Sequence, residues 1–248
     1  MPRFFEPDAA QAKSLSLTGR EAHHALDVLR LGDGDALTLL DGAGHRFECV
    51  IQSHARDRVM LAVKEKVFTP APPCAITLLA GVPKGKIFED IVEKATELGA
   101  ARVVPLLTER TVVHFDAKTA VAKVEKWQQV AVESIKQCGS PWLPKIEPPM
   151  PPAQFLARGE KFDLSLVGSL QTARKHPREW LEEFRVANQR PPQSVAVWIG
   201  PEGDFTLAEL QAIEATGARP VSLGRLVLRV ETAAVYCLSI LNYELQPA

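Results

Sequence analysis

Two stretches near the C-terminal end of the chain decide its fold: Trp198-Ile-Gly-Pro-Glu-Gly-Asp-Phe205 and Leu223-Gly-Arg-Leu-Val-Leu-Arg-Val-Glu-Thr-Ala-Ala234. A continuous apolar run over residues 195–199 predicts a buried strand before Gly200, and a second short strand is expected over residues 219–223, before Gly224. A predicted helix follows each loop. Thr206 and Glu209 have the spacing of a capping box, so the first helix begins there and is expected to end near Gly217. Because ligands of open α/β sheets bind beyond the carboxyl ends of strands, both loops are candidate ligand loops.

Glycines in these loops would let the backbone approach a bound molecule closely. They are Gly200, Gly203 and Gly224. The alternative interpretation of Gly-Pro-Glu-Gly is a tight turn that binds nothing. A second loop at the right distance, with its own Arg-x-Glu-Thr-Ala sequence, favours a ligand.

Composition limits the class of protein. The 248 residues are 46% hydrophobic, which suffices for one large or two modest cores, and the formal net charge is −1. Any RNA-binding surface must therefore be a local patch rather than a global field. Four widely separated cysteines predict reduced thiols, and no apolar run suits a signal peptide or a membrane span. We expect a cytoplasmic protein.

A proline-rich stretch, Thr69-Pro-Ala-Pro-Pro73, predicts a linker between two domains, residues 1–68 and 74–248. In the first domain, Thr18 and Glu21 suggest another capping box before a short helix over residues 23–30. Short strands at 36–40, 46–51 and 59–63 then suggest a small β-barrel.

The second domain alternates strands and helices, which predicts an α/β fold with a mostly parallel sheet. The further strands are expected at residues 76–80, 103–107 and 162–167, and the further helices at 85–98, 118–137, 178–186 and 233–241. The proline cluster at residues 148–152 is expected to be a surface loop.

Several common motifs are absent from the sequence. A G-x-G-x-x-G after a strand, a complete P-loop, G-x-S-x-G and H-E-x-x-H are all missing, which argues against dinucleotide-binding, phosphate-loop, serine-hydrolase and zinc-protease sites. The one close histidine pair, His23-His24, cannot converge on a metal from a helix. No metal is expected.

The two glycine loops resemble those of the SPOUT-class RNA methyltransferases. More narrowly, they resemble the bacterial family that methylates N3 of a uridine, uridine 1498, in 16S ribosomal RNA. The resemblance covers nearly the whole chain, since other family stretches occur in order: Pro2-Arg-Phe-Phe5, Pro83-Lys-Gly-Lys86, Lys94-Ala-Thr-Glu-Leu-Gly99 and Pro105-Leu-Leu-Thr-Glu-Arg110. It implies S-adenosyl-L-methionine as cofactor, a deep trefoil knot, a PUA-like N-terminal domain, a ribosomal RNA or small-subunit substrate, and a homodimer.

Three positions depart from the family pattern. Asp204 stands where the family usually has glycine, although aspartate tolerates left-handed backbone better than most residues. Arg225 lies one position early, with Leu226 in the family arginine's place, whereas Arg229 matches. Ser140 replaces an arginine that often follows the Gln-Cys-Gly run.

The resemblance assigns candidate roles residue by residue. Arg229 would stabilise negative charge on the uracil, and Glu231 would act as a base. Candidates for cofactor binding are Val167, Gly168, Ile199, Gly200, Pro201, Glu202, Gly203, Leu223, Gly224, Leu228, Thr232 and Ala233. Candidates for RNA contact are Arg3, Arg30, Lys84, Lys86, Arg110 and Gln137.

Each role has a structural alternative. Glu231 could serve solely as a first-turn carboxylate that interacts favourably with the helix dipole. Arg229 could pair with Glu231 or Glu202, and Arg110 could form a structural ion pair. The last helix could be a buried core helix rather than a dimer interface. At the level of function, the alternatives are a non-catalytic RNA-binding or assembly factor with this fold and a SPOUT methyltransferase with a different RNA target.

Overall fold

The computed structural model describes residues 1–113, 115–170 and 174–246, and the chain divides into two compact units. Unit 1 comprises Met1–Ala71 and Val132–Leu143, and unit 2 comprises Pro72–Ala131 and Pro144–Ala248. The chain passes from unit 1 to unit 2 within the proline-rich stretch. It returns to unit 1 for the last turns of one long helix, which the sequence did not indicate.

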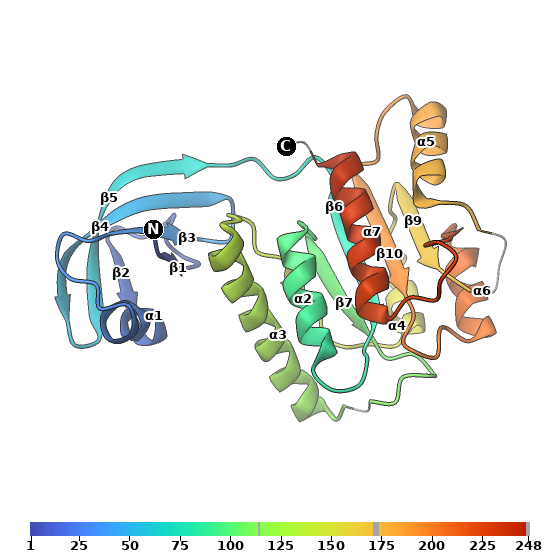
Figure 1. Cartoon of the computed structure of the whole chain (residues 1–248), viewed down its shortest axis with the longest axis horizontal. Coiled ribbons are helices and arrows are strands. Elements are labelled where there is room, and N and C mark those ends of the chain that lie inside the picture. The colour runs from blue at the N-terminus through green and yellow to red at the C-terminus, as the bar shows by residue number, and fades with distance from the viewer. Residues whose placement is uncertain (114, 171–173, 247–248) are drawn as a thin grey trace. The chain divides into compact units, whose positions relative to one another are not determined.

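Unit 1 is built on a curled five-stranded sheet with the strand order β1-β3-β4-β5-β2 (Figure 1). The strands β2, β5, β4 and β3 pair antiparallel, and β1 adds to β3 in parallel. The described residues do not pair β1 with β2, so the expected small barrel is an open half-barrel. Its elements are β1 (Arg3–Phe5), β2 (Leu15–Thr18), α1 (Gly19–His23), η1 (His24–Val28), β3 (Ala36–Leu40), β4 (His45–Ala55) and β5 (Arg58–Phe68).

The predicted capping box at Thr18 is wrong, because the side chain of Thr18 makes no capping hydrogen bond. Glu21 instead accepts a hydrogen bond from the backbone N–H of Phe5 at 3.2 Å. Its other oxygen accepts one at 2.8 Å from the ammonium of Lys136, which is only 7% exposed. Glu21 therefore ties β1 to the last turns of the long helix. The predicted helix also ends early, since Arg30 is left-handed with φ 56°.

Unit 2 contains a six-stranded sheet in which every strand pairing is parallel, in the order β11-β9-β10-β6-β7-β8. Its strands are β6 (Ala75–Gly81), β7 (Arg102–Leu106), β8 (Lys145–Ile146), β9 (Leu164–Gly168), β10 (Ser194–Ile199) and β11 (Arg219–Val221). Its helices are α2 (Ile87–Glu97), α4 (Pro152–Leu156), α5 (Pro177–Asn188), α6 (Leu207–Ala215) and α7 (Val230–Leu245), with most of α3 (Ala117–Cys138). The α/β prediction is confirmed.

The two faces of this sheet bury different helices. On one face α4 and α6 pack against β10, with Phe155, Leu210 and Ile213 around the ring of Trp198. On the other face α2 and α7 lie side by side over the sheet (Figure 1). Because both faces are covered, the central strands β6, β9 and β10 are mostly apolar and buried, as the continuous runs predicted.

Of two local predictions for unit 2, one is confirmed and the other is wrong in part. The capping box at Thr206 is confirmed: Thr206 Oγ1 accepts from the Glu209 N–H at 3.3 Å, and a Glu209 oxygen accepts from the Thr206 N–H at 2.9 Å. The surface loop expected at residues 148–152 is wrong in part. Met150 is buried and Pro152 begins α4, where its fixed φ suits the first helical position.

No helix within the described ranges combines the length and the apolar character that crossing a bilayer requires.

Gly81, the last residue of β6, lies against the loop that follows β10. A Cβ at position 81 would lie 2.5 Å from the backbone N of Pro201, inside van der Waals contact. Two backbone segments far apart in sequence therefore approach each other at a point where only glycine fits.

We predict that Gly81→Ala lowers the free energy of unfolding by about 1–3 kcal/mol, because the added methyl must displace backbone rather than a flexible side chain. Gly32→Ala is the matched control, since a Cβ there meets nothing within 4 Å. The control should change stability by less than about 0.5 kcal/mol. Urea denaturation of both variants measures the difference, and equal stability would contradict the close approach.

Candidate functional site

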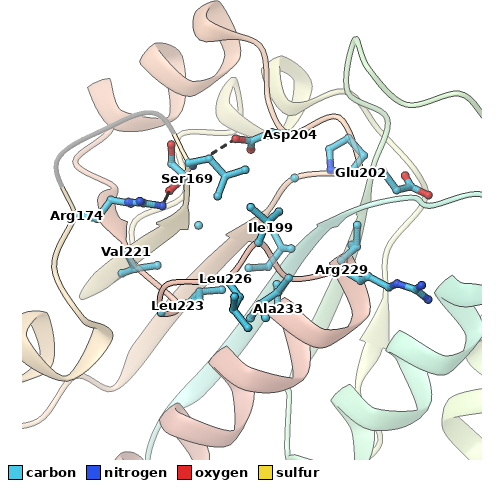
Figure 2. A pocket seen from close by; sticks show the side chains of 18 residues that line it. Ser169, Arg174, Ile199, Glu202, Asp204, Val221, Leu223, Leu226, Arg229 and Ala233 are labelled. Carbon is cyan, nitrogen blue, oxygen red and sulfur yellow. Dashed lines mark hydrogen bonds between the residues drawn. The ribbon is translucent and has the colours of Figure 1, made fainter.

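A cavity of about 300 Å³ opens at the carboxyl ends of β9, β10 and β11, beside the first turn of α7 (Figure 2). Three loops and this helix end surround it, one loop from each strand. The lining residues are Gly168, Ser169, Leu170, Arg174, Ile199, Gly200, Pro201, Glu202, Asp204, Val221, Leu223, Gly224, Leu226, Val227, Leu228, Arg229, Val230 and Ala233. The cavity thus occupies the position that strand order in an α/β sheet predicts.

The loop after β10 is both a tight turn and a cavity wall. The carbonyl of Pro201 accepts a hydrogen bond from the N–H of Asp204 at 2.8 Å, which closes the turn. Asp204 is left-handed with φ 60°, as expected for a residue in the family's glycine position. A Cβ on Gly200 would lie 2.9 Å from Asp204 Oδ1 and 3.0 Å from the Phe205 N. The two interpretations of Gly-Pro-Glu-Gly are therefore compatible.

The loop after β11 supplies the apolar part of the cavity. Gly224 has φ 111°, which L-residues rarely adopt, and a Cβ there would meet nothing within 4 Å. Backbone conformation, not crowding, favours glycine at this position. Leu226 and Val227 are 79% and 75% exposed although both line the cavity. Apolar side chains held open to solvent in this way are suited to covering a bound molecule.

The loop after β9 connects the other two loops. The N–H of Leu170 donates to Asp204 Oδ2 at 3.4 Å, and Lys175 O accepts from the N–H of Ser222 at 2.9 Å. Arg174 donates from its guanidinium to the carbonyl of Ser169 at 2.8 Å. The three loops therefore hold one another in place by hydrogen bonds.

Four charged side chains line the cavity, two of each sign: Arg174, Arg229, Glu202 and Asp204. In the part of the chain that the structure describes, none of the four takes part in an ion pair. Charges of both signs around a largely apolar cavity suit a ligand that is itself charged at several points.

Arg229 and Glu231 differ in their relation to the cavity. Arg229 is the N-cap residue of α7, and its guanidinium points away from the cavity into solvent (Figure 2). Glu231 lies in the first turn of α7, outside the cavity lining. The alternative of an ion pair between Arg229 and Glu231 or Glu202 is not found among the described residues. For Glu231 the helix-dipole interpretation fits its position directly.

Most of the candidate cofactor residues come together at the cavity: Gly168, Ile199, Gly200, Pro201, Glu202, Leu223, Gly224, Leu228 and Ala233. Val167, Gly203 and Thr232 do not line it. Val167 is fully buried among the side chains under α4 and α6, because neighbouring strand residues face opposite ways. Gly203 faces Arg110, since a Cβ added at Gly203 would lie 3.1 Å from the Cβ of Arg110.

Two parts of the cavity lining were not predicted from the sequence: the segment after β9 and the exposed apolar residues after Gly224. Ser169, Leu170 and Arg174 carry no glycine pattern, and only the position of β9 between β10 and β11 brings them to the cavity. The predicted strand ending before Gly168 was the one available signal. For Leu226 and Val227, the available signal was the pair of adjacent apolar residues within a predicted loop.

The candidate RNA residues of unit 1 have different surroundings. Arg3 donates to the carbonyls of Lys136 and Gln137 at 3.1 and 2.9 Å, where it caps the C-terminal end of α3. Its guanidinium therefore has a structural role. Arg30 and the side chain of Gln137 are exposed.

In unit 2, Lys84 and Lys86 are exposed around the start of α2. Arg110 donates to the carbonyl of Gly203 at 2.7 Å, so it supports the loop after β10. Nearby, the N–H of Glu109 donates to Glu209 at 2.9 Å. Neither contact is the ion pair considered from the sequence, but both hold the cavity wall.

The cysteines form no disulfide, as predicted. Burial raises the pKa of Cys237, on α7, to about 12, so this thiol is not a nucleophile at neutral pH. No group of three or more His, Cys, Asp or Glu residues suited to a metal ion occurs in the described ranges.

Comparison with known proteins identifies both parts of the chain. A family model described as an RNA methyltransferase domain matches residues 70–242, and an RNA methyltransferase PUA domain matches residues 17–61. The ribosomal RNA small subunit methyltransferase E of Bacillus subtilis is 30% identical over 98% of this chain and 97% of its own length. The protein of the same name from Synechocystis is 33% identical, over 95% of this chain and 75% of its own length.

Solved structures agree with these matches. A putative methyltransferase from Legionella pneumophila, solved with bound S-adenosylmethionine, has a TM-score of 0.85 at 30% identity and covers 98% of this chain and 97% of its own. A probable rRNA methyltransferase from Porphyromonas gingivalis has a TM-score of 0.83 at 28% identity, with 99% and 98% covered. The chain therefore belongs to the family of RNA methyltransferases in which a PUA domain accompanies an RNA methyltransferase domain.

Proposed function

We propose that this protein transfers the methyl group of S-adenosyl-L-methionine to N3 of a uridine in small-subunit ribosomal RNA. The observation that carries the proposal is the cavity that three loops form at the ends of β9, β10 and β11. It is supported by the ligand-bound relative from Legionella pneumophila and by the names of the ribosomal RNA methyltransferases that this chain resembles. The uridine is the one that the family resemblance implies, and the proposed location is the cytoplasm.

The cavity fits the cofactor in its size and chemistry. Its apolar wall, formed by Ile199, Val221 and Leu223, suits the flat face of the adenine, and the glycine loops leave backbone groups accessible at its edge. Glu202 places negative charge at the cavity, which suits a cofactor that carries a sulfonium cation. When bound, the cofactor supplies the electrophilic methyl group.

Orientation would account for much of the rate. In the transfer, the bond between N3 and the methyl carbon forms as the bond from that carbon to sulfur breaks. Holding the two reactants in line can remove roughly 7–11 kcal/mol of barrier. The hydrogen bonds among the three loops support a rigid cradle for the cofactor half of this geometry.

The target uracil must also lose its N3 proton. Negative charge then develops on the uracil oxygens, and a nearby cation lowers the energy of that charge. Arg229 starts at the cavity rim and projects its guanidinium away from the cavity (Figure 2). We expect the target base to approach from that side. We assign Arg229 this role. Glu231 or water would accept the proton.

The exposed side of α7 supports a proposed homodimer. Thr232, Tyr236, Ser239 and Tyr243 are exposed and recur at the three- and four-residue spacing of one helix stripe, with Tyr243 85% exposed. The opposite side of α7 is buried against α2 and the sheet, as the core-helix interpretation expects, and the exposed stripe is the surface that we propose for the dimer. The trefoil knot stays a prediction from the resemblance.

Mass spectrometry of ribosomal RNA tests the proposed activity. RNA from a strain that lacks this gene should contain unmethylated uridine at the target position, and restoring the gene should restore N3-methyluridine. A non-catalytic assembly factor predicts no change in any methylated nucleoside. A changed modification in transfer RNA, or at another base of ribosomal RNA, would support the alternative of a different target.

Arg229→Ala is predicted to lower the single-turnover rate by about a hundred- to a thousandfold with little change in cofactor affinity, because it removes charge stabilisation from the transition state. Arg225→Ala is the matched control, since Arg225 is exposed in the same loop but does not line the cavity. Normal chemistry in Arg229→Ala would leave orientation as the main source of catalysis.

The same rate measurement across pH assigns the proton acceptor. If Glu231 is the base, Glu231→Gln slows transfer and makes the rate depend more steeply on pH. If Glu231 only interacts with the helix dipole, glutamine costs a few tenths to about 1 kcal/mol of stability with near-normal turnover. The position of Glu231 outside the cavity leads us to expect the second result.

A further inference from the structure

Arg174 and Asp204 line the cavity but have no part in the proposed proton or methyl transfer. They lie on either side of Ser169, at the end of β9 (Figure 2). Among the described residues neither is in an ion pair, so neither has a described partner of opposite charge at the cavity. A protein site that keeps two opposite charges apart is suited to a ligand that carries the complementary pair.

The hydrogen bonds of these side chains hold them in place without using all their capacity. One Arg174 N–H donates to the carbonyl of Ser169 at 2.8 Å, and a guanidinium has five donors. Asp204 accepts from the N–H of Phe205 at 2.8 Å and from that of Leu170 at 3.4 Å, whereas a carboxylate accepts about four hydrogen bonds. Both side chains are therefore oriented and still able to bind a further polar group.

We propose that Arg174 and Asp204 recognise the methionine end of the cofactor, with Arg174 binding the α-carboxylate and Asp204 the α-ammonium. This inference rests on the proposed function, since it assumes that S-adenosylmethionine occupies the cavity. The zwitterion of that amino acid matches the two charges in number and in sign. The apolar wall on the side of Leu223 and Leu226 is left for the adenosine (Figure 2).

Asp204 stands where the family usually has glycine, so this pair of charges is specific to this chain. Its left-handed backbone, with φ 60°, is one that glycine adopts freely, so a side chain here has a conformational cost. The carboxylate bonds to the loop after β9 and to its own loop, so it also joins two walls of the cavity. A glycine at this position would supply the turn but not the charge.

Two thioether nucleosides separate this role from a structural one. S-adenosylhomocysteine carries the amino-acid zwitterion without the sulfonium, and 5′-methylthioadenosine lacks the amino-acid part. Calorimetry on the full chain should show that Asp204→Asn weakens S-adenosylhomocysteine about tenfold and leaves 5′-methylthioadenosine unchanged. Arg174→Gln should have the same selective effect. Asp204→Gly should match Asp204→Asn, because the charge rather than the backbone is responsible.

Matched controls have the same chemical change outside the cavity. Arg225→Gln alters an exposed arginine of the loop after β11, and Asp90→Asn alters an exposed carboxylate on α2, and neither residue lines the cavity. Both should bind the two nucleosides as the unaltered protein does.

The outcomes are distinct. An equal loss of affinity for both nucleosides would show that Arg174 and Asp204 only shape the loops, and unchanged affinity for S-adenosylhomocysteine would show that they do not contact the amino-acid end. Either result overturns the inference while the proposed function stands. An unaltered protein that binds neither nucleoside nor S-adenosylmethionine would overturn both.

Discussion

Parallel pairing of β9 with both β10 and β11 is the constraint on which the site depends. Because all three strands run the same way, their carboxyl ends meet at one edge, and three loops that are distant in sequence become neighbours. Hydrogen bonds then connect the loops: Leu170 to Asp204, and Ser222 to Lys175. Two further contacts support the loop after β10. Gly81 lies close against Pro201, and Arg110 donates a hydrogen bond to the carbonyl of Gly203. The site is therefore a consequence of sheet order more than of any single motif.

The sequence predicted much of this arrangement, for reasons that particular residues make clear. Continuous apolar runs predicted the positions of β6, β7, β9 and β10. A strand that is covered on both faces is apolar along most of its length, so the run marks the strand. Thr206 and Glu209 predicted the start of α6 because a capping box is local chemistry. The same pattern failed at Thr18, where Glu21 contacts Phe5 and Lys136 instead; a partner more than a hundred residues away cannot be inferred from spacing. β1, β2 and β8 are too short for a detectable pattern, and Arg174 reaches the cavity only through strand order.

The proposed chemistry divides between two parts of the cavity rim. On the side of β9, Arg174 and Asp204 face a position suited to an amino acid. At the start of α7, the guanidinium of Arg229 projects away from the cavity, on the side where we propose that the target base enters. Separating recognition of the cofactor from stabilisation of the target leaves the methyl group between them, which is what an in-line transfer requires. Leu226 and Val227 line the same cavity and are exposed, so we expect them to cover a bound cofactor and shield the reaction from water.

Amide hydrogen exchange with and without S-adenosylmethionine tests the central claim most directly, because it reports all three loops in one measurement. The cofactor is expected to slow exchange together at residues 168–170, 199–205 and 221–230, with little change in unit 1. A second cavity of about 460 Å³ in unit 2, lined by Phe155, Trp180 and Phe184, provides the internal comparison. Protection at that cavity, or at only one of the three loops, would contradict a single cofactor site built by β9, β10 and β11.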